Sequence, residues 1–290
     1  MVPGLSGLLT FCGENNQIRG IFPTIIKLCE KRIQMLDEII EIARKAGRFL
    51  KENEGKISEV KEKGSFANLV TDIDKGSEAL IKTFINEKFP DHGILAEESG
   101  ASLPTAEYRW LIDPLDGTTN FTHGFPVYSV SIAVEQKGEL IAGAVYDPNF
   151  GELFYAEKGG GAFMNGMKLQ VTMTDKLEKS MLATGFPYDV RNNPFKCVQH
   201  FEEFLVRAQA VRRLGSAALD ICYVAAGRLD GFWEVNLHPW DTAAAVLITT
   251  EAGGKVTGFN GEKYSIYQRD VVLSNGMIHD EMLEVIKKNL

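Results

Sequence analysis

The chain has 290 residues, of which 44% are hydrophobic and 24% charged, a composition typical of a globular protein rather than a disordered one. Its 39 acidic residues outnumber its 31 basic ones, and the net charge of −8 disfavours general binding to nucleic acids or anionic membranes. No apolar run approaches the roughly 20 residues of a membrane span, so we expect no membrane partner. The negative net charge does not exclude a phosphorylated small molecule as a ligand, if metal ions supply positive charge for its phosphate.

The first 34 residues differ from the rest of the chain. Gly4 to Leu9 is short and broken by glycine, and no basic residue precedes Arg19, which argues against a signal peptide. We expect residues 1–34 to be a peripheral or poorly ordered extension outside the core, with Met35 as a candidate natural start. The four cysteines are too sparse for a disulfide scaffold and indicate a reducing, cytoplasmic location.

Residues 35–170 have the pattern of an α+β part. Apolar residues recur at helical spacing over 35–50 and again over 76–89, with a polar loop over 61–66 between them. Short apolar runs bounded by turn residues then predict strands. The runs are 94–96, 110–112, 127–135, 140–146 and 152–156, and the last three alternate like an antiparallel meander.

Residues 171–290 alternate strands and helices, which is typical of an α/β part. The predicted strands are 181–184, 211–214, 229–234 and 271–274. The predicted helices are 195–207, 216–226 with a Ser cap, 242–251 ended by two glycines, and one that closes the chain. No linker separates the two parts, so we expect them to share one layered core.

The most informative segment is 110–121, where Asp113 and Asp116 follow a buried strand. Asp-Pro and Asp-Gly each commonly form turns, but both in one short stretch after an apolar strand favour a chemical role. Asp116-Gly117-Thr118 presents backbone N–H groups beside a carboxylate. Amides suit a phosphate, whereas a carboxylate repels one unless hard cations such as Mg²⁺ lie between them.

Two further acidic features have two interpretations each. Glu97-Glu98 ends a short apolar strand, where a solvated turn is the alternative to a metal ligand. Asp241 follows Trp240 at the start of a helical pattern, where it is either a ligand or the N-cap of that helix.

Several motifs together resemble the inositol monophosphatase family of lithium-sensitive, Mg²⁺-dependent phosphatases, over about residues 35–290. The motifs are 96–99 (AEES), 110–121 (WLIDPLDGTTNF), Trp240-Asp241 and 251–254 (EAGG), while 183–187 and 215–220 look most like the bacterial branch. The resemblance implies an α/β (α+β) fold, a layered αβαβα sandwich of the sugar-phosphatase type. It also implies a phosphoric monoester hydrolase, a homodimer and two to three Mg²⁺ ions.

The resemblance also implies residue roles. The metal ligands are Glu97, Asp113, the Leu115 carbonyl, Asp116 and Asp241. Thr118 binds the attacking water and pairs with Asp74, so that Thr118, Asp74 and Glu97 are the catalytic residues. The substrate-binding residues are Asp116, Gly117, Thr118, Ala217, Glu234 and Asp241. Lys63, in the polar loop, matches a lysine near the more weakly bound metal, and Glu98 is expected to reach a metal through water.

The residue after Thr118 bears on the substrate. Relatives that hydrolyse 3′-phosphoadenosine 5′-phosphate or histidinol phosphate tend to have Lys there, whereas this chain has Thr119, which favours inositol 1-phosphate and similar polyol monophosphates. Fructose-1,6-bisphosphatase or a broader sugar-phosphate phosphatase is the enzymatic alternative. A non-catalytic binding partner of the transcription machinery is the alternative of another class, since bacterial relatives associate with that machinery.

Overall fold

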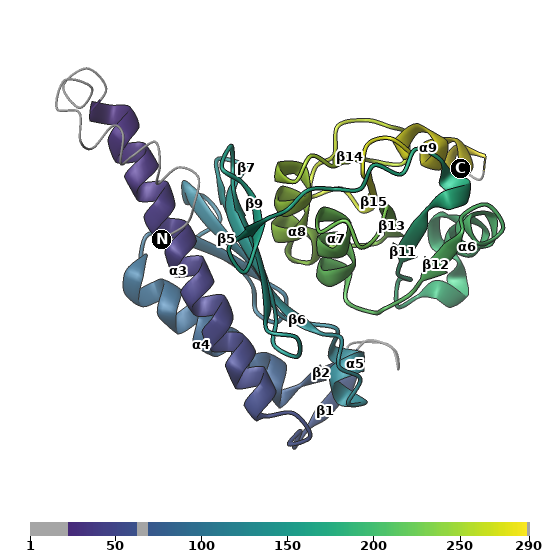
Figure 1. Cartoon of the computed structure of the whole chain (residues 1–290). Coiled ribbons are helices and arrows are strands. Elements are labelled where there is room, and N and C mark those ends of the chain that lie inside the picture. The colour runs from purple at the N-terminus through teal and green to yellow at the C-terminus, as the bar shows by residue number, and fades with distance from the viewer. Residues whose placement is uncertain (1–22, 63–68, 289–290) are drawn as a thin grey trace.

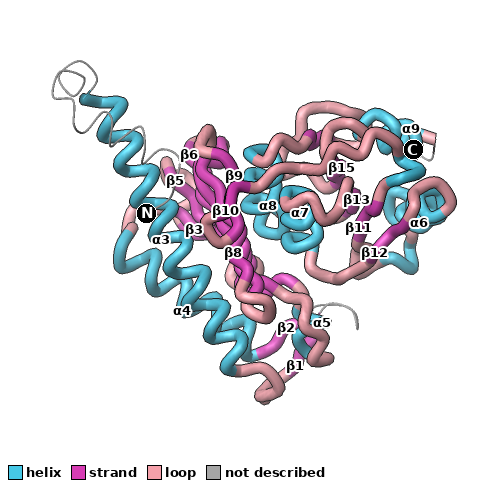
Figure 2. Tube along the Cα trace, in the orientation of Figure 1, coloured by secondary structure: helices cyan, strands magenta, loops and turns pink. Residues whose placement is uncertain are grey.

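The computed structural model describes residues 23–62 and 69–288, and it has five layers (Figure 1). Helices α3 (Pro23–Glu52) and α4 (Asp72–Lys88) cover the outer face of a large sheet. Helices α7 (Ala217–Ala225) and α8 (Pro239–Glu251) lie between that sheet and a smaller one, and α6 (Cys197–Leu205) and α9 (His279–Lys287) cover the smaller sheet. Figure 2 shows the same alternation of helices and strands. The αβαβα sandwich expected from the resemblance is confirmed.

The first sheet has eight strands in the order β10-β9-β8-β7-β6-β5-β3-β4, antiparallel except for the pair β3 and β5. Its strands are β3 (Gly93–Ala96), β4 (Gly100–Ser102), β5 (Tyr108–Asp116), β6 (Ser129–Gln136), β7 (Glu139–Asp147), β8 (Glu152–Glu157), β9 (Gly161–Met164) and β10 (Met167–Lys168). The predicted meander is confirmed as β6 to β8. A separate hairpin joins β1 (Val60–Glu62) and β2 (Leu69–Thr71).

The second sheet has five strands in the order β12-β11-β13-β15-β14, of which β12, β11 and β13 are parallel. Its strands are β11 (Met181–Thr184), β12 (Ala210–Arg212), β13 (Gly231–Val235), β14 (Lys255–Thr257) and β15 (Asp270–Ser274). The helices are α3 (Pro23–Glu52), α4 (Asp72–Lys88), α5 (Thr118–Thr122), α6 (Cys197–Leu205), α7 (Ala217–Ala225), α8 (Pro239–Glu251) and α9 (His279–Lys287).

Helix α8 lies unusually close to the first sheet at Gly143 of β7. A Cβ placed on Gly143 would lie 3.0 Å from the Cα of Ala244 and 3.2 Å from its Cβ. Glycine and alanine at this crossing therefore let the helix approach the sheet backbone. Because α8 carries Asp241 near its beginning, this contact also fixes where Asp241 lies relative to β5 and β6.

Helices α3 and α4 begin earlier than their apolar patterns predict. Helix α4 begins at Asp72, four residues before the predicted 76, because Thr71 caps it: the Thr71 Oγ1 accepts hydrogen bonds from the backbone N–H groups of Ile73 and Asp74. Helix α3 begins at Pro23, so residues 23–34 of the predicted extension are helical. The rest of that extension lies outside the described residues, and the division at 34 and 170 stays a prediction.

No helix in the described part of the chain is both long and apolar enough to cross a membrane.

Candidate active site

A bulge in β5 brings the two carboxylates of the central motif together. Asp113 pairs with Ser131 of β6 and Asp116 with Ser129, so three steps along β5 match two along β6. In a regular strand residues three apart point to opposite faces, and the extra residue removes that offset. Pro114 lies in the bulge, where its carbonyl accepts a hydrogen bond from the Ser77 hydroxyl at 2.9 Å. The sequence Asp-Pro-Leu-Asp therefore directs both acids into one cavity.

The turn after β5 requires glycine. Gly117 has a φ of +96°, and a Cβ there would lie 3.0 Å from the Val127 carbonyl oxygen and 3.2 Å from that of Gly215. The turn starts the short helix α5, whose first residue is Thr118. The Thr118 hydroxyl lies 2.8 Å from Oδ1 of Asp74 and 3.1 Å from the Leu115 carbonyl oxygen. The pairing of Thr118 with Asp74 is thus present in the structure.

Asp74 itself is completely buried and held from its other side. Its Oδ2 accepts the backbone N–H of Thr71 at 2.8 Å and the Thr71 hydroxyl at 2.5 Å. Burial raises the pKa of Asp74, although its hydrogen bonds with Thr71 and Thr118 partly offset the rise. A raised pKa makes this carboxylate a better acceptor for a proton from Thr118.

Asp116 links β5 of the first sheet to the beginning of helix α7. Its Oδ2 accepts a short hydrogen bond from the Ser216 hydroxyl and one from the backbone N–H of Ala218 at 2.9 Å, and its Oδ1 accepts that of Ala217 at 3.3 Å. The first amides of α7 thus bind a carboxylate from β5, which favours the helix N-terminus. Ser216 caps α7, as the sequence predicts. The anchoring of α7 by Asp116 was not predicted.

Asp241 is not the N-cap of α8, so that interpretation is wrong. The N-cap is His238, and Asp241 is the third helical residue, whose Oδ2 accepts the His238 backbone N–H at 2.7 Å. Pro239 begins the helix because it lacks an N–H that would need a partner there. Helix α8 thus begins three residues before the predicted 242, and the Asp241 side chain lies beside the cavity.

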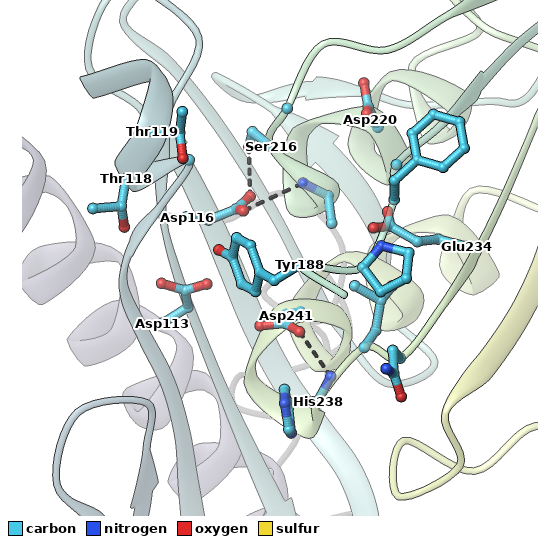
Figure 3. A pocket seen from close by; sticks show the side chains of 18 of the residues that line it. Asp113, Asp116, Thr118, Thr119, Tyr188, Ser216, Asp220, Glu234, His238 and Asp241 are labelled. Atoms are coloured by element: carbon cyan, nitrogen blue, oxygen red, sulfur yellow. Dashed lines mark hydrogen bonds between the residues drawn. The ribbon is translucent and has the colours of Figure 1, made fainter. Parts of the chain in front are cut away.

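These elements enclose a cavity of about 410 Å³ between the two sheets (Figure 3). The predicted site residues that line it are Glu97, Asp113, Leu115, Asp116, Gly117, Thr118, Ala217, Glu234 and Asp241. Asp74 lies behind Thr118. Glu98 does not line the cavity, and its backbone N–H donates to Glu78 instead. Lys63 lies outside the described residues.

The carboxylates in the cavity destabilise one another's charge. Burial raises the pKa of Asp113 well above its usual value, and three carboxylates add to the rise: Glu97, Asp116 and Asp241. Burial also raises the pKa of Asp241 well above its usual value, with Glu97 as the next cause. Among the described residues, the guanidinium groups in the cavity lining are those of Arg213 and Arg269. The acidic cluster therefore favours the uptake of cations or protons.

This donor set fits a hard divalent cation. Glu97, Asp113, Asp116 and Asp241 supply carboxylate oxygens without any His or Cys, which suits Mg²⁺ better than zinc. Within residues 23–62 and 69–288, however, no three His, Cys, Asp or Glu side chains are already arranged to hold a metal ion. The oxygen donors therefore line one cavity, but they are not arranged as a complete set of metal ligands.

The cavity lining also includes residues that were not predicted as site residues, among them Asp220, Arg213 and Tyr188. Asp220 lies in the stretch 215–220, which the sequence marks only as typical of the bacterial branch. The Tyr188 hydroxyl points toward Asp113 and Asp116 (Figure 3), although half of the side chain is exposed. The part of Tyr188 that lies in the cavity is buried, which raises the pKa of its hydroxyl, and the cavity carboxylates add to the effect. No sequence signal distinguishes these residues from ordinary turn and helix residues.

Glu234 gives a pH-dependent prediction. Burial raises its pKa to about 8, against the opposing effect of Arg213. Because the folded state keeps this proton when the unfolded state has lost it, Glu234 makes stability fall as pH rises from about 4.5 to 8. We expect metal-free Glu234→Gln to melt above the wild type, by a difference that grows across this range and is constant above it. A difference independent of pH would contradict the assignment.

The comparisons with known proteins agree with this fold and cavity. The model described as the inositol monophosphatase family matches residues 32–290. The inositol-1-monophosphatase of Mesorhizobium japonicum is 40% identical over 89% of this chain and 98% of its own. The fructose-1,6-bisphosphatase/inositol-1-monophosphatase of Thermotoga maritima is 39% identical over 87% and 96%. The Nus factor SuhB of Vibrio cholerae is 41% identical over 88% and 96%.

Solved structures resemble most of this chain. The inositol monophosphatase of Anabaena sp. PCC 7120 has a TM-score of 0.79 and 40% identity over 89% of this chain and 96% of its own. An IMPase/NADP phosphatase complexed with Mg²⁺ and phosphate has a TM-score of 0.78 and 25% identity over 88% and 95%. The fold and its acidic cavity thus define a phosphoric monoester hydrolase. The chain belongs to the inositol monophosphatase family.

Proposed function

We propose that this protein hydrolyses inositol monophosphate, of the myo-inositol 1-phosphate type, to inositol and phosphate in a Mg²⁺-dependent reaction. The observation that carries the proposal is the cluster of buried Asp113 and Asp116 with half-buried Asp241 in one cavity. The same cavity is lined by Thr118, whose hydroxyl donates to Asp74. The relatives named inositol monophosphatase support the substrate, and the Mg²⁺ and phosphate bound by one structural neighbour support the cation.

Glu97, Asp113, Asp116, Asp241 and the Leu115 carbonyl would hold two to three Mg²⁺ ions. When bound, such ions supply positive charge for the phosphate and lower the pKa of water. The Leu115 carbonyl oxygen has a second lone pair beyond the one used by Thr118, so it can serve both partners. Glu98, which lies outside the cavity lining, would contact the ions only through water.

The chain's own residues would orient the reactants and accept the proton. The Thr118 hydroxyl, which donates to Asp74, would also hydrogen-bond the attacking water. A proton would then pass from water to Thr118 as Thr118 releases its own to Asp74. The amides of Gly117 and Thr118, at the start of α5, would bind the phosphate oxygens. Glu234 and Ala217 lie across the cavity, where the alcohol would bind.

Fructose-1,6-bisphosphatase activity is a second candidate function. The observation that favours it is the presence of Arg213 and Arg269 in the cavity lining, because guanidinium groups bind a second phosphate well. Arg269 is positioned by Asn236, because the Arg269 Nη1 donates a hydrogen bond to the Asn236 Oδ1 at 3.1 Å. The name of the Thermotoga relative includes both activities.

Phosphate release from a panel of esters tests both candidates. The panel holds inositol 1-phosphate, fructose 1,6-bisphosphate, glucose 6-phosphate and 3′-phosphoadenosine 5′-phosphate, each with Mg²⁺ and with EDTA. We expect the highest kcat/KM on inositol 1-phosphate and no turnover in EDTA. Preference for the bisphosphate would favour the second candidate, and full turnover in EDTA would refute the role of Mg²⁺.

A non-catalytic role with the transcription machinery rests on the relatives named Nus factor. Such a role is compatible with catalysis, because Glu97, Asp113, Asp116 and Asp241 are all present. Pull-down with the Asp113→Asn protein would reveal a partner whose binding does not need turnover. The homodimer, lithium sensitivity and cytoplasmic location implied by the resemblance stay predictions.

A further inference from the structure

Two buried acids in the cavity lie outside the carboxylate cluster. Asp220 belongs to α7 and Glu234 to β13, and both line the side of the cavity opposite Asp113 and Thr118 (Figure 3). Glu234 has an expected role toward the substrate alcohol. Asp220 has no expected role, and yet it is an acid of which only 1% is exposed.

Asp220 lacks the partners that usually explain a buried acid. Its Oδ1 is buried and has no hydrogen-bond partner among the described residues. It does not cap α7 either, because Ser216 is the N-cap and the amides of Ala217 and Ala218 bind Asp116. Nearly all buried polar atoms in native proteins have a partner, so an unpartnered oxygen on a residue that lines a cavity points to a ligand.

The charges around Asp220 favour a neutral hydroxyl as that ligand. Burial raises the pKa of Asp220 well above its usual value, and the charges of Glu234 and Asp116 add to the rise while Arg213 opposes it. A carboxyl group that keeps its proton both donates and accepts one hydrogen bond. An alcohol hydroxyl has the same two capacities, so the two groups are matched.

We propose that Asp220 determines substrate specificity by hydrogen-bonding a hydroxyl of the alcohol half of the phosphate ester, beside Glu234. The phosphate half binds at the opposite wall, near Asp113, Asp116 and Thr118, so Asp220 takes no part in the bond cleavage. The inference rests on the proposed hydrolysis of polyol phosphates and deepens it. It predicts selection for alcohols rich in hydroxyl groups, because a site built to pair with a hydroxyl rejects an analogue without one.

The test compares inositol 1-phosphate with p-nitrophenyl phosphate, a monoester whose alcohol has no further hydroxyl. For Asp220→Leu, which removes both hydrogen-bond capacities while keeping the branched shape of the side chain, we expect kcat/KM on inositol 1-phosphate to fall about 10- to 100-fold. On p-nitrophenyl phosphate it should change less than threefold, and the Ki of inorganic phosphate should stay the same. Asp220→Asn, which still donates and accepts, should keep the preference of the wild type within about threefold.

Asp147→Asn is the matched control. Asp147 is also a completely buried acid with a raised pKa and an unpartnered oxygen, but it does not line the cavity. Its substitution should leave the ratio of the two kcat/KM values unchanged. If Asp220→Leu does not fold, Asp220→Ala is measured by the same ratio.

The outcomes separate the inference from the proposed function. An unchanged ratio in the folded Asp220→Leu or Asp220→Ala protein would overturn the inference, as would an equal loss on both substrates. Failure of the proposed function appears instead in the wild type, which would then show no preference for inositol 1-phosphate over p-nitrophenyl phosphate.

Discussion

Asp113→Asn is expected to lower kcat by about three orders of magnitude or more. Asp113 lies in the β5 bulge at the centre of the cluster, where burial raises its pKa and three other carboxylates add to the rise: Glu97, Asp116 and Asp241. An amide keeps the shape of the side chain but loses the charge that binds the cation and thereby activates water. Steady-state phosphate release at saturating Mg²⁺ measures the change. Activity within tenfold of the wild type would refute the assignment.

Thermal melting distinguishes loss of the cation from loss of the fold. We expect Mg²⁺ to raise the melting temperature of the wild type, since it binds only the folded state, and to raise that of Asp113→Asn much less. Without Mg²⁺ the variant should melt at or above the wild-type temperature. The raised pKa means that the charged form of Asp113 opposes folding above its unfolded-state pKa, and the amide removes this charge.

Asp230→Asn is the control for this comparison. Asp230 is buried too, but it accepts hydrogen bonds from Thr172 and Met181 outside the cavity. Its loss should lower the melting temperature while the shift caused by Mg²⁺ persists. Equal Mg²⁺ shifts in the wild type and in Asp113→Asn would exclude Asp113 as a ligand.

The elements that the sequence predicts best are those whose signals are local. The strand 181–184 agrees residue for residue, because an apolar run bounded by turns fills one buried strand. Helix α7 agrees because its Ser216 cap and apolar face both lie in the sequence. The starts of α4 and α8 were missed because Thr71 and Pro239 precede the apolar pattern that marks each helix.

The site residues likewise divide into those that a local sequence motif predicts and those that depend on the folded structure. Asp113, Asp116 and Thr118 were predictable because they are adjacent in one motif. The bulge that directs both acids to one side was not, since it depends on the register of β5 against β6. Asp220 was missed because its importance comes from burial without a partner, and a single sequence does not record which atoms remain unpaired after folding.

Thr118→Val is expected to lower kcat by about 100- to 10,000-fold, the usual contribution of a positioned proton acceptor. Valine keeps the shape of threonine and removes the hydroxyl that lies 2.8 Å from Asp74, so water loses its path for the proton. Thr118→Ser retains the hydroxyl and should stay within about tenfold of the wild type. Both variants should bind inorganic phosphate with Ki values close to that of the wild type.

Asp74→Asn examines the other end of the same path. If Thr118 and Asp74 act as one unit, the double variant should be only slightly slower than the slower single variant, because the second change removes a path already broken. Independent roles would instead multiply the two losses. Burial raises the pKa of Asp74, so wild-type kcat should rise with pH as this carboxyl loses its proton. That ascending limb should disappear in Asp74→Asn, and its persistence there would assign the titration to another group.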